Sequence, residues 1–391
     1  MIGRKQIVIL GCLLMIGLAG LCGCGSPSSD SMERVGTEAD HAADVPGGLT
    51  YESSMELQYA KNFSVDDYEG GYKILKTMDG TQILVVPEEK EVPDGIGKDV
   101  VVVKRPVKNL YVVSSSIMDI FSKLDAMDTI RLSSQKEEDW YVQDAKDAMS
   151  RGDILYAGKY SKPDYELIVS ENCSLAIENT MITHSPEVSE MLADFDIPTM
   201  IEYSSYESHP LGRVEWVKFF GALIGKDELA QKIFNEEVRL VDEVTSVEKT
   251  DKTVAFFYVT SNGLIQVRSS SDYVPKMISL AGGNYIPTNI GDPDSKRSTV
   301  SMQIEDFYDQ AKDVDFIIYN SSIDGGIGSV QELLDKCAVL KDFKAVKEKN
   351  VWCTTNDMYQ QSMSIGYLIH DMHAMLQGKD QDEMTYLFHV E

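Results

Sequence analysis

Short apolar, β-branched runs alternate with helical patterns along most of this chain, and no other feature restricts its fold as strongly. In the first half we predict strands at 110–113, 175–177 and 199–202, with helices at 118–124, 165–170 and 186–195. In the second half we predict strands at 253–259, 316–319 and 350–353, with helices at 273–281, 330–336 and 364–376. Alternation of this kind favours an α/β fold with mainly parallel sheets.

A long helical stretch separates the two halves. A helical pattern runs from Arg213 to about Leu223, Gly225 interrupts it, and Asp227 can cap a longer helix. We therefore expect two Rossmann-like lobes joined by one long helix, with a ligand cleft between the lobes. The expected parts are an N-terminal lobe at 49–212, linking helices at 213–250 and a C-terminal lobe at 251–391.

The region 50–103 precedes the regular alternation. Apolar runs at 72–75 and 82–86 flank Asp79 and Gly80, which is the pattern of a β-hairpin, and a further strand is predicted at 100–103. We expect a hairpin extension of the N-terminal lobe. Its role does not follow from the sequence.

The first 48 residues carry signals for export. Arg4 and Lys5 precede the apolar run 7–21, whose length is typical of a secretory signal peptide and too short for a confident membrane span. Leu21-Cys22-Gly23-Cys24 resembles the lipobox of bacterial lipoproteins. We predict a lipoprotein signal peptide at 1–23, lipidation of Cys24 and a disordered tether at 24–48. The alternative is an ordinary signal peptide that is cleaved nearby.

The charge balance of the chain excludes some partners. It has 63 acidic and 36 basic residues, and the formal net charge of −27 opposes binding to nucleic acid or to a membrane through a basic patch. Cys173, Cys337 and Cys353 lie beyond the signal region, far apart and without C-x-x-C spacing. They indicate neither a disulfide framework nor a zinc site, although a single pairing among them stays open.

Polar segments follow the predicted strands of both lobes, at the ends where open α/β sheets bind ligands. Their hydroxyl, amide, Met and Tyr side chains suit a pocket for a small ligand. The candidate ligand-binding residues up to the start of the linking helices are Ser114, Ser116, Met118, Trp140, Tyr141, Met181, His184, Tyr206, Glu207, His209 and Arg213. The candidates in the second half are Asn262, Ser321 and Tyr359.

The loop 204–213 contains Glu207, His209 and Arg213, which can make an acid/base pair, a metal site, an anion pocket or a polar turn. The chain has no P-loop, G-x-S-x-G or H-E-x-x-H motif. We therefore expect no catalytic residues, and an exported enzyme that uses Glu207 and His209 is the less favoured alternative. His184 and His209 are too few for a bare metal site, so we expect no metal held by the protein alone and no cofactor.

Four stretches form a common pattern by their order and spacing: 108–113 with 118–127, 163–168 before 175–177, 219–230, and 277–284, which ends in Leu280-Ala281-Gly282-Gly283-Asn284. Together they resemble the solute-binding lipoproteins of ABC importers that bind ferric siderophores, haem or cobalamin. The resemblance covers about 105–380 and leaves the extension outside the common pattern. It implies a lipid-anchored, extracytoplasmic monomer that captures a metal chelate and delivers it to an ABC permease and its ATPase.

The resemblance further implies that one surface glutamate on each lobe docks to the permease. Glu166 and Glu305 stand at the matching positions, although a glutamate is also favoured there by the helix dipole alone. The expected ligand is an iron complex, either a ferric siderophore or haem, and a corrinoid is the alternative. Tyr359 can stack on a macrocycle or catecholate, and Arg213 can pair with a ligand carboxylate.

Two further expectations concern the ligand. Trp140 and Tyr141 are also candidates for stacking, with core packing as the alternative reading. An axial ligand of haem iron is available among Met181, His184, Tyr206 and His209. The sequence does not choose among the chelates.

Overall fold

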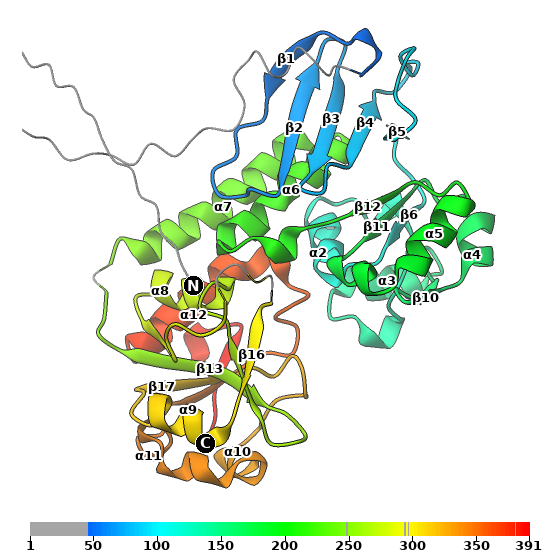
Figure 1. Cartoon of the computed structure of the whole chain (residues 1–391). Helices are drawn as coiled ribbons and strands as arrows, with labels where there is room; N and C mark the ends of the chain where they lie inside the picture. Colours follow the sequence, from blue (N-terminus) through cyan, green and yellow to red (C-terminus); the bar gives the residue numbers. More distant parts are fainter. Residues whose placement is uncertain (1–45, 248, 293–294, 296, 380) are drawn as a thin grey trace, which may run out of the picture. The chain divides into compact units, whose positions relative to one another are not determined.

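The structure is a computed structural model that describes residues 46–391, except for 248, 293–294, 296 and 380 (Figure 1). The predicted signal peptide, Cys24 and nearly all of the predicted tether lie outside these residues. Among the described residues, no helix is both long and apolar enough to cross a bilayer.

The N-terminal lobe is built on a five-stranded sheet whose strands are all parallel. The order is β12-β11-β6-β7-β8. The strands are β6 (Leu110–Val112), β7 (Ile130–Ser133), β8 (Leu155–Tyr156), β11 (Leu175–Glu178) and β12 (Thr199–Ile201). Leu110 and Val112 belong to one core and Tyr111 and Val113 to another, because successive side chains point to opposite faces of a strand.

Four α-helices connect these strands. They are α2 (Ser115–Lys123), α3 (Gln143–Ser150), α4 (Tyr165–Ser170) and α5 (Pro186–Asp194). A short ribbon of β9 (Gly158–Lys159) and β10 (Lys162–Pro163) precedes α4. The segment expected to be a loop at 178–184 instead begins in β11 and continues as a 3-10 helix at Thr180–His184, because the Asn179 side chain accepts the Met181 N–H.

The C-terminal lobe holds a mixed sheet of seven strands in the order β16-β14-β13-β17-β18-β19, with β15 also paired to β13. β13 (Thr253–Val259), β15 (Asn284–Ile286), β17 (Phe316–Tyr319) and β18 (Val351–Thr354) pair in parallel. β14 (Ile265–Arg268), β16 (Thr299–Met302) and β19 (Leu387–His389) add antiparallel pairs. Its helices are α8 (Tyr273–Leu280), α9 (Ile304–Ala311), α10 (Val330–Lys336), α11 (Lys344–Lys347) and α12 (Ile365–Leu376). The two lobes confirm the predicted α/β class.

A pair of helices links the lobes, α6 (Pro210–Ile224) and α7 (Asp227–Thr245). Gly225 ends α6 in the left-handed conformation, with φ of 81°, which glycine adopts without a steric penalty. A Cβ on Gly221 would lie 2.5 Å from the Cβ of Ala230, so this glycine allows the two helices to pack closely. The longer of the two, α7, is the predicted linking helix.

The extension is a five-stranded sheet rather than a hairpin (Figure 1). Its strands are β1 (Tyr51–Ser54), β2 (Phe63–Tyr68), β3 (Tyr72–Thr77), β4 (Gln82–Val86) and β5 (Val100–Lys104), and β3 and β4 form the predicted hairpin. No strand was predicted at β2, because its sequence contains two aspartates. Asp66 is nevertheless buried, where it accepts a hydrogen bond from Ser54 and pairs with Lys76.

One face of this sheet packs on α6. Phe63, Val65 and Leu75 share a core with Trp216 and Phe219 of the helix. The other face is covered in part by the segment between β4 and β5, through Val92 and Ile96. The extension is therefore joined to the linking helices by a continuous apolar core.

Candidate functional site

A small cavity lies where α2, α6, α8 and α12 meet, and we call it the floor cavity. Its lining comprises Ser116, Ile117, Ile120, Ser204, Arg213, Tyr273, Met277, Met358, Tyr359, Gln361, Ser362, Ser364, Ile365, Leu368 and Tyr386. Its volume is about 30 Å³, which is roughly the space of one water molecule. Both lobes contribute lining residues to it.

Arg213 is the cation of the floor cavity. Its guanidinium stacks on the ring of Tyr273 at 3.7 Å and donates to the Ser205 carbonyl at 2.6 Å and the Glu207 carbonyl at 3.4 Å. Among the described residues it has no carboxylate partner within 4.0 Å. A cation that is held in place by neutral groups is available to an anionic ligand.

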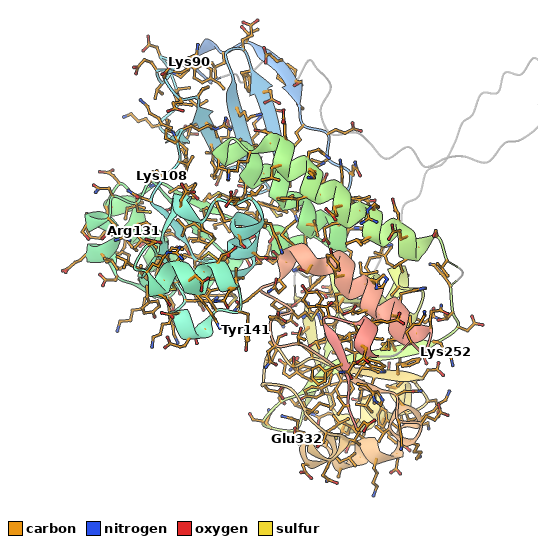
Figure 2. All side chains as sticks on the ribbon, turned by 180° about the vertical axis from the view of Figure 1, so that it is seen from behind. Lys90, Lys108, Arg131, Tyr141, Lys252 and Glu332 are labelled. Atoms are coloured by element: carbon orange, nitrogen blue, oxygen red, sulfur yellow. The ribbon has the colours of Figure 1, made fainter. Side chains whose placement is uncertain are left out.

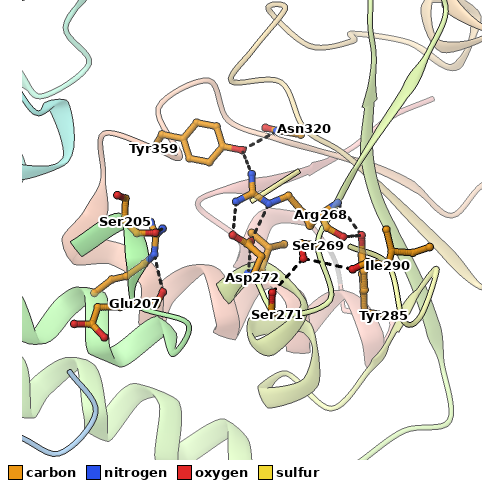
Figure 3. A network of polar contacts seen from close by, with 12 residues as sticks. Ser205, Glu207, Arg268, Ser269, Ser271, Asp272, Tyr285, Ile290, Asn320 and Tyr359 are labelled. Carbon is orange, nitrogen blue, oxygen red and sulfur yellow. Dashed lines mark hydrogen bonds and ion pairs between the residues drawn. The ribbon is translucent and has the colours of Figure 1, made fainter. Parts of the chain in front are cut away.

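A second arginine, Arg268, lies beside the same tyrosine ring but is neutralised. It forms a two-pronged ion pair with Asp272, with both N···O distances 2.8 Å, and donates to the Tyr359 hydroxyl at 3.2 Å (Figure 3). Burial disfavours the Arg268 cation, but Tyr359 and Asp272 outweigh this effect and raise its pKa. Arg268 and Tyr273 are not among the predicted ligand residues, since a strand arginine and a helix tyrosine carry no motif.

Tyr359 is fixed by two donors. Its oxygen accepts from Arg268 and, at 2.8 Å, from the Asn320 side-chain amide (Figure 3). These two bonds leave the hydroxyl hydrogen of Tyr359 as the donor that this side chain can offer to a ligand in the floor cavity.

A larger pocket of about 370 Å³ lies at the carboxyl ends of the N-terminal-lobe strands, and we call it the N-lobe pocket. Its lining is Val113, Ser115, Ser134, Gln135, Lys136, Asp139, Tyr156, Lys159, Tyr160 and Asn179. Four parallel strands thus end at one pocket, which is where ligands bind in open α/β sheets. Lys136, Lys159, Tyr156 and Tyr160 were missed because no strand was predicted between 124 and 165.

The loop 204–209, which leads into α6 and which we call the hinge loop, places Glu207 and His209 outside the lining of the floor cavity. Glu207 is buried and accepts from the backbone N–H groups of Lys61 and Asn62 and from the Trp216 indole. Burial raises its pKa, against the effect of these donors. It therefore holds the extension to the hinge, which explains its burial without a ligand.

His209 caps α6. Its Nδ1 accepts the Leu211 N–H at 3.2 Å, and its ring stacks on Tyr59 of the extension with centroids 4.5 Å apart. Burial and the nearby Lys276 lower its pKa to about 4, so the imidazole is neutral at pH 7. The less favoured alternative was that Glu207 and His209 form an acid/base pair, and the described structure has no hydrogen bond between them.

Several predicted ligand residues are buried. Trp140 and Met118 belong to the core of the N-terminal lobe, and both are 1% exposed or less. Ser114 donates to Glu202 at 2.7 Å, and Ser321 bonds to Thr354. Their positions fit packing and loop-fixing roles, whereas Ser116 lines the floor cavity with Arg213 and Tyr359.

Other predicted residues are exposed. Met181, His184 and Asn262 lie at the surface, and Asn262 accepts a hydrogen bond from Thr260 in its own turn. The Tyr141 side chain is also exposed (Figure 2). Tyr206 and Glu207 line a polar pocket of about 300 Å³ beside the hinge, which we call the hinge pocket. The described residues contain no group of three or more His, Cys, Asp or Glu side chains that could hold a metal ion.

A strap formed by 360–363 ties the lobes together. The Gln360 side chain accepts the Tyr141 N–H at 2.7 Å and donates to the Asp139 carbonyl at 2.9 Å. Ser362 donates to the Ser116 carbonyl at 2.6 Å, and the Met363 N–H donates to Asp119 at 2.7 Å. The strap follows directly on Met358 and Tyr359, so the floor cavity is adjacent to the contact between the lobes.

Comparison with known sequences gives distant relatives, and no protein-family profile matches the chain. An uncharacterized lipoprotein of Methanocaldococcus jannaschii, MJ0878, is 22% identical over 378 residues, which cover 91% of this chain and 89% of the relative. A second one, MJ0872, is 23% identical over 406 residues, which cover 99% of this chain and all of the relative.

Three solved structures illustrate the structural likeness. The periplasmic haem-binding protein HutB of Vibrio cholerae has a TM-score of 0.55 at 14% identity and covers 67% of this chain and 97% of its own. An ABC transporter substrate-binding protein of Listeria monocytogenes gives 0.51 at 17%, covering 69% and 98%. The molybdate-binding protein MolA of Haemophilus influenzae gives 0.52 at 12%, covering 70% and 86%. The chain therefore has the two-lobed fold of the periplasmic solute-binding proteins.

Proposed function

We propose that the protein is an extracytoplasmic solute-binding protein that captures an anionic metal chelate and delivers it to an ABC permease. The observation that carries this proposal is the Arg213 cation, which faces a cavity between the lobes without a carboxylate partner among the described residues. The fold supports binding rather than catalysis, as does the name of each structural neighbour.

An iron complex, haem or a ferric siderophore, is the favoured ligand. The N-lobe pocket offers the rings of Tyr156 and Tyr160 for stacking on a ligand. Lys159 and Lys136, the second of which also pairs with Glu138 at 3.5 Å, can bind the negative charge of a chelate. The floor cavity adds Arg213 and the Tyr359 hydroxyl. A chelate that spans both sites needs the lobes to separate on entry and to approach again around it.

Titration of tryptophan fluorescence tests the ligand class. Haem, a ferric catecholate complex, cobalamin and molybdate are added to the native protein, Arg213→Gln and Lys108→Gln, a control at an exposed lysine paired with Asp128. We expect saturable quenching by an iron complex, weakened about tenfold in Arg213→Gln and unchanged in Lys108→Gln. Saturable quenching by cobalamin or molybdate alone would contradict an iron complex as the ligand. Equal affinity in all three proteins would show that Arg213 does not contact the ligand.

The lipid anchor and the permease contacts are parts of the same proposal. The distant relatives are named lipoproteins, which supports lipidation of Cys24. Incorporation of a labelled fatty acid that is lost in Cys24→Ser tests this point.

Glu166 and Glu305 suit a docking role because each is exposed and is the second residue of its helix, α4 or α9. Each helix leads into a central parallel strand, β11 or β17. We expect Glu166→Ala with Glu305→Ala to abolish uptake while ligand affinity stays unchanged. The control is Glu190→Ala with Asp309→Ala, two exposed acids on α5 and α9. Normal uptake by the first pair would contradict the docking role.

A further inference from the structure

The hinge pocket is lined by three separate parts of the chain. The extension contributes Lys61, the hinge loop contributes Ser205 and Ser208, and the C-terminal lobe contributes Ser271, Arg297 and Ser298. This pocket is separate from the floor cavity and shares none of its lining residues. It combines basic side chains with several hydroxyl groups.

The extension is held firmly where it enters this pocket. The Gln58, Tyr59 and Ala60 N–H groups donate to the buried Glu215 carboxylate at 2.8–3.2 Å, and the Lys61 N–H donates to Glu207 at 3.0 Å. A Cβ on Gly212 would lie 3.1 Å from the Tyr59 carbonyl, so this glycine permits the close approach. The backbone of Lys61 is thereby fixed at the pocket wall.

The two carboxylates of the pocket are already used. Glu207 accepts two backbone N–H groups and the Trp216 indole, and Asp272 pairs with Arg268 and accepts the Val274 N–H at 3.0 Å. Neither is left to neutralise Lys61 or Arg297. Among the described residues that line the pocket, Lys61 and Arg297 are therefore the basic side chains that have no oppositely charged partner.

Lys61 and Arg297 are exposed, and within the described part of the chain neither has an ion-pair partner within 4.0 Å. This is unexpected for two cations in a chain with 63 acidic and 36 basic residues. The Ser208 and Ser298 hydroxyls also form no hydrogen bond to a described residue. Two cations next to hydroxyl donors are the groups that bind carboxylate or phosphate oxygens.

We propose that the hinge pocket is an anion-binding site that takes a carboxylate or phosphate group, with Lys61 and Arg297 as its charged contacts. Its volume of about 300 Å³ accommodates such a group together with water. The site gives the extension a role in binding, because one of its two cations comes from outside the lobes. It goes beyond the proposed function and does not depend on Arg213.

Calorimetric titration of the whole mature protein with inorganic phosphate and, separately, with acetate tests the proposal. The native protein is compared with Lys61→Gln, Arg297→Gln and the double variant. Each single change should weaken binding of the preferred anion roughly tenfold, and the double variant should show no measurable binding. Higher ionic strength should also weaken binding in the native protein.

Lys276→Gln is the matched control, since Lys276 is an exposed cation on α8 near His209 that does not line the pocket. It should bind like the native protein, and all variants should keep the native unfolding midpoint. Equal binding by the native protein and the double variant, or binding of neither anion by the native protein, would overturn the site. Native affinity of the double variant for an iron complex would leave the proposed function intact and mark the pocket as a site for a free anion. Phosphate binding without any chelate binding would refute the proposed function alone.

Discussion

Two glutamates with no exposed surface show how much the surroundings of a buried carboxyl group can differ within this molecule. Glu215, where α6 meets the extension, accepts three backbone N–H groups and pairs with Lys218 at 2.8 Å. Glu178, at the end of β11, has no hydrogen-bond partner on either oxygen among residues 46–391 as far as they are described, and burial raises its pKa to about 8. Burial itself therefore says little about stability, and the number of donors that meet the carboxylate decides the sign of its contribution.

The largest effect is expected for Glu215→Gln. The change removes the ion-pair partner of Lys218, which is 3% exposed and otherwise donates to the Glu56 carbonyl at 3.4 Å and lies over the Phe234 ring at 4.2 Å. Leaving a buried ammonium unpaired should lower the free energy of unfolding by about 3–5 kcal/mol. Urea unfolding measures it, with the exposed Glu190→Gln as a control within about 0.5 kcal/mol of the native protein. A decrease in the free energy of unfolding of less than about 1 kcal/mol would contradict the stabilising role of the Glu215–Lys218 pair.

Glu178→Gln should have the opposite effect at neutral pH. The unfolded-state pKa is 4.5 and the folded-state pKa is about 8, so the folded protein binds this proton more tightly. The resulting stability is fully present below pH 4.5 and is lost as the pH rises through 8. A neutral amide avoids this loss, so the variant should gain about 3 kcal/mol at pH 7 and little at pH 4.

Urea unfolding of the native protein and Glu178→Gln at several pH values measures this gain. Because the glutamine side chain is also polar and buried, the pH-dependent part of the difference in unfolding free energy reports the ionisation of Glu178. A gain that does not change between pH 4 and pH 7 would contradict the role of ionisation.

Glu207→Gln is the intermediate case. Its carboxylate meets two backbone donors and one indole, but it has no cationic partner among the described residues. We expect a loss of about 1–2 kcal/mol, because an amide oxygen still accepts some of these bonds. The Trp216 emission should shift as well, and the exposed Ser205→Ala should change neither quantity. An unchanged emission spectrum would argue against the indole bond.

Lys73→Gln should have the smallest effect. Lys73 joins β3 to the start of α7 through Asp67 and, at 2.9 Å, Asp227, whose side chains are 30% and 37% exposed. Partly exposed pairs contribute little, so we expect a loss of about 0.5 kcal/mol that disappears at high salt. If Lys73→Gln lowered the free energy of unfolding as much as Glu215→Gln, solvent exposure would not explain why the two ion pairs contribute differently to stability.

The regular part of the fold was predictable because its strands are continuous apolar runs. The strand Thr253–Val259, the strand Phe316–Tyr319 and the helix Val330–Lys336 have the predicted bounds. The strand at β2 was missed because Asp66 and Asp67 break its apolar pattern. Asp66 can be buried because it contacts Ser54 and Lys76, and these two residues lie on other strands, outside the β2 sequence.

The site was less predictable for the same reason. Arg213 and Tyr359 were found because they follow strand ends, and both line the floor cavity. Arg268 was missed because a buried arginine is identified only by its partner, Asp272, and by the ring on which it lies. Glu207 was seen as a site residue, but its real neighbours, the N–H groups of Lys61 and Asn62, are about 145 residues away in the sequence.

The strap has a consequence for how such a protein can change its ligand. On the N-terminal lobe, the groups that Gln360 and Ser362 bind are the main-chain atoms of Asp139, Tyr141 and Ser116. Main-chain atoms are the same whichever amino acid occupies a position. Mutations at these three positions can therefore alter the chemistry that the lobe presents to a ligand while the bonds that hold the lobes together are kept. Recognition and lobe attachment can evolve separately in this molecule, even though they share the same few residues.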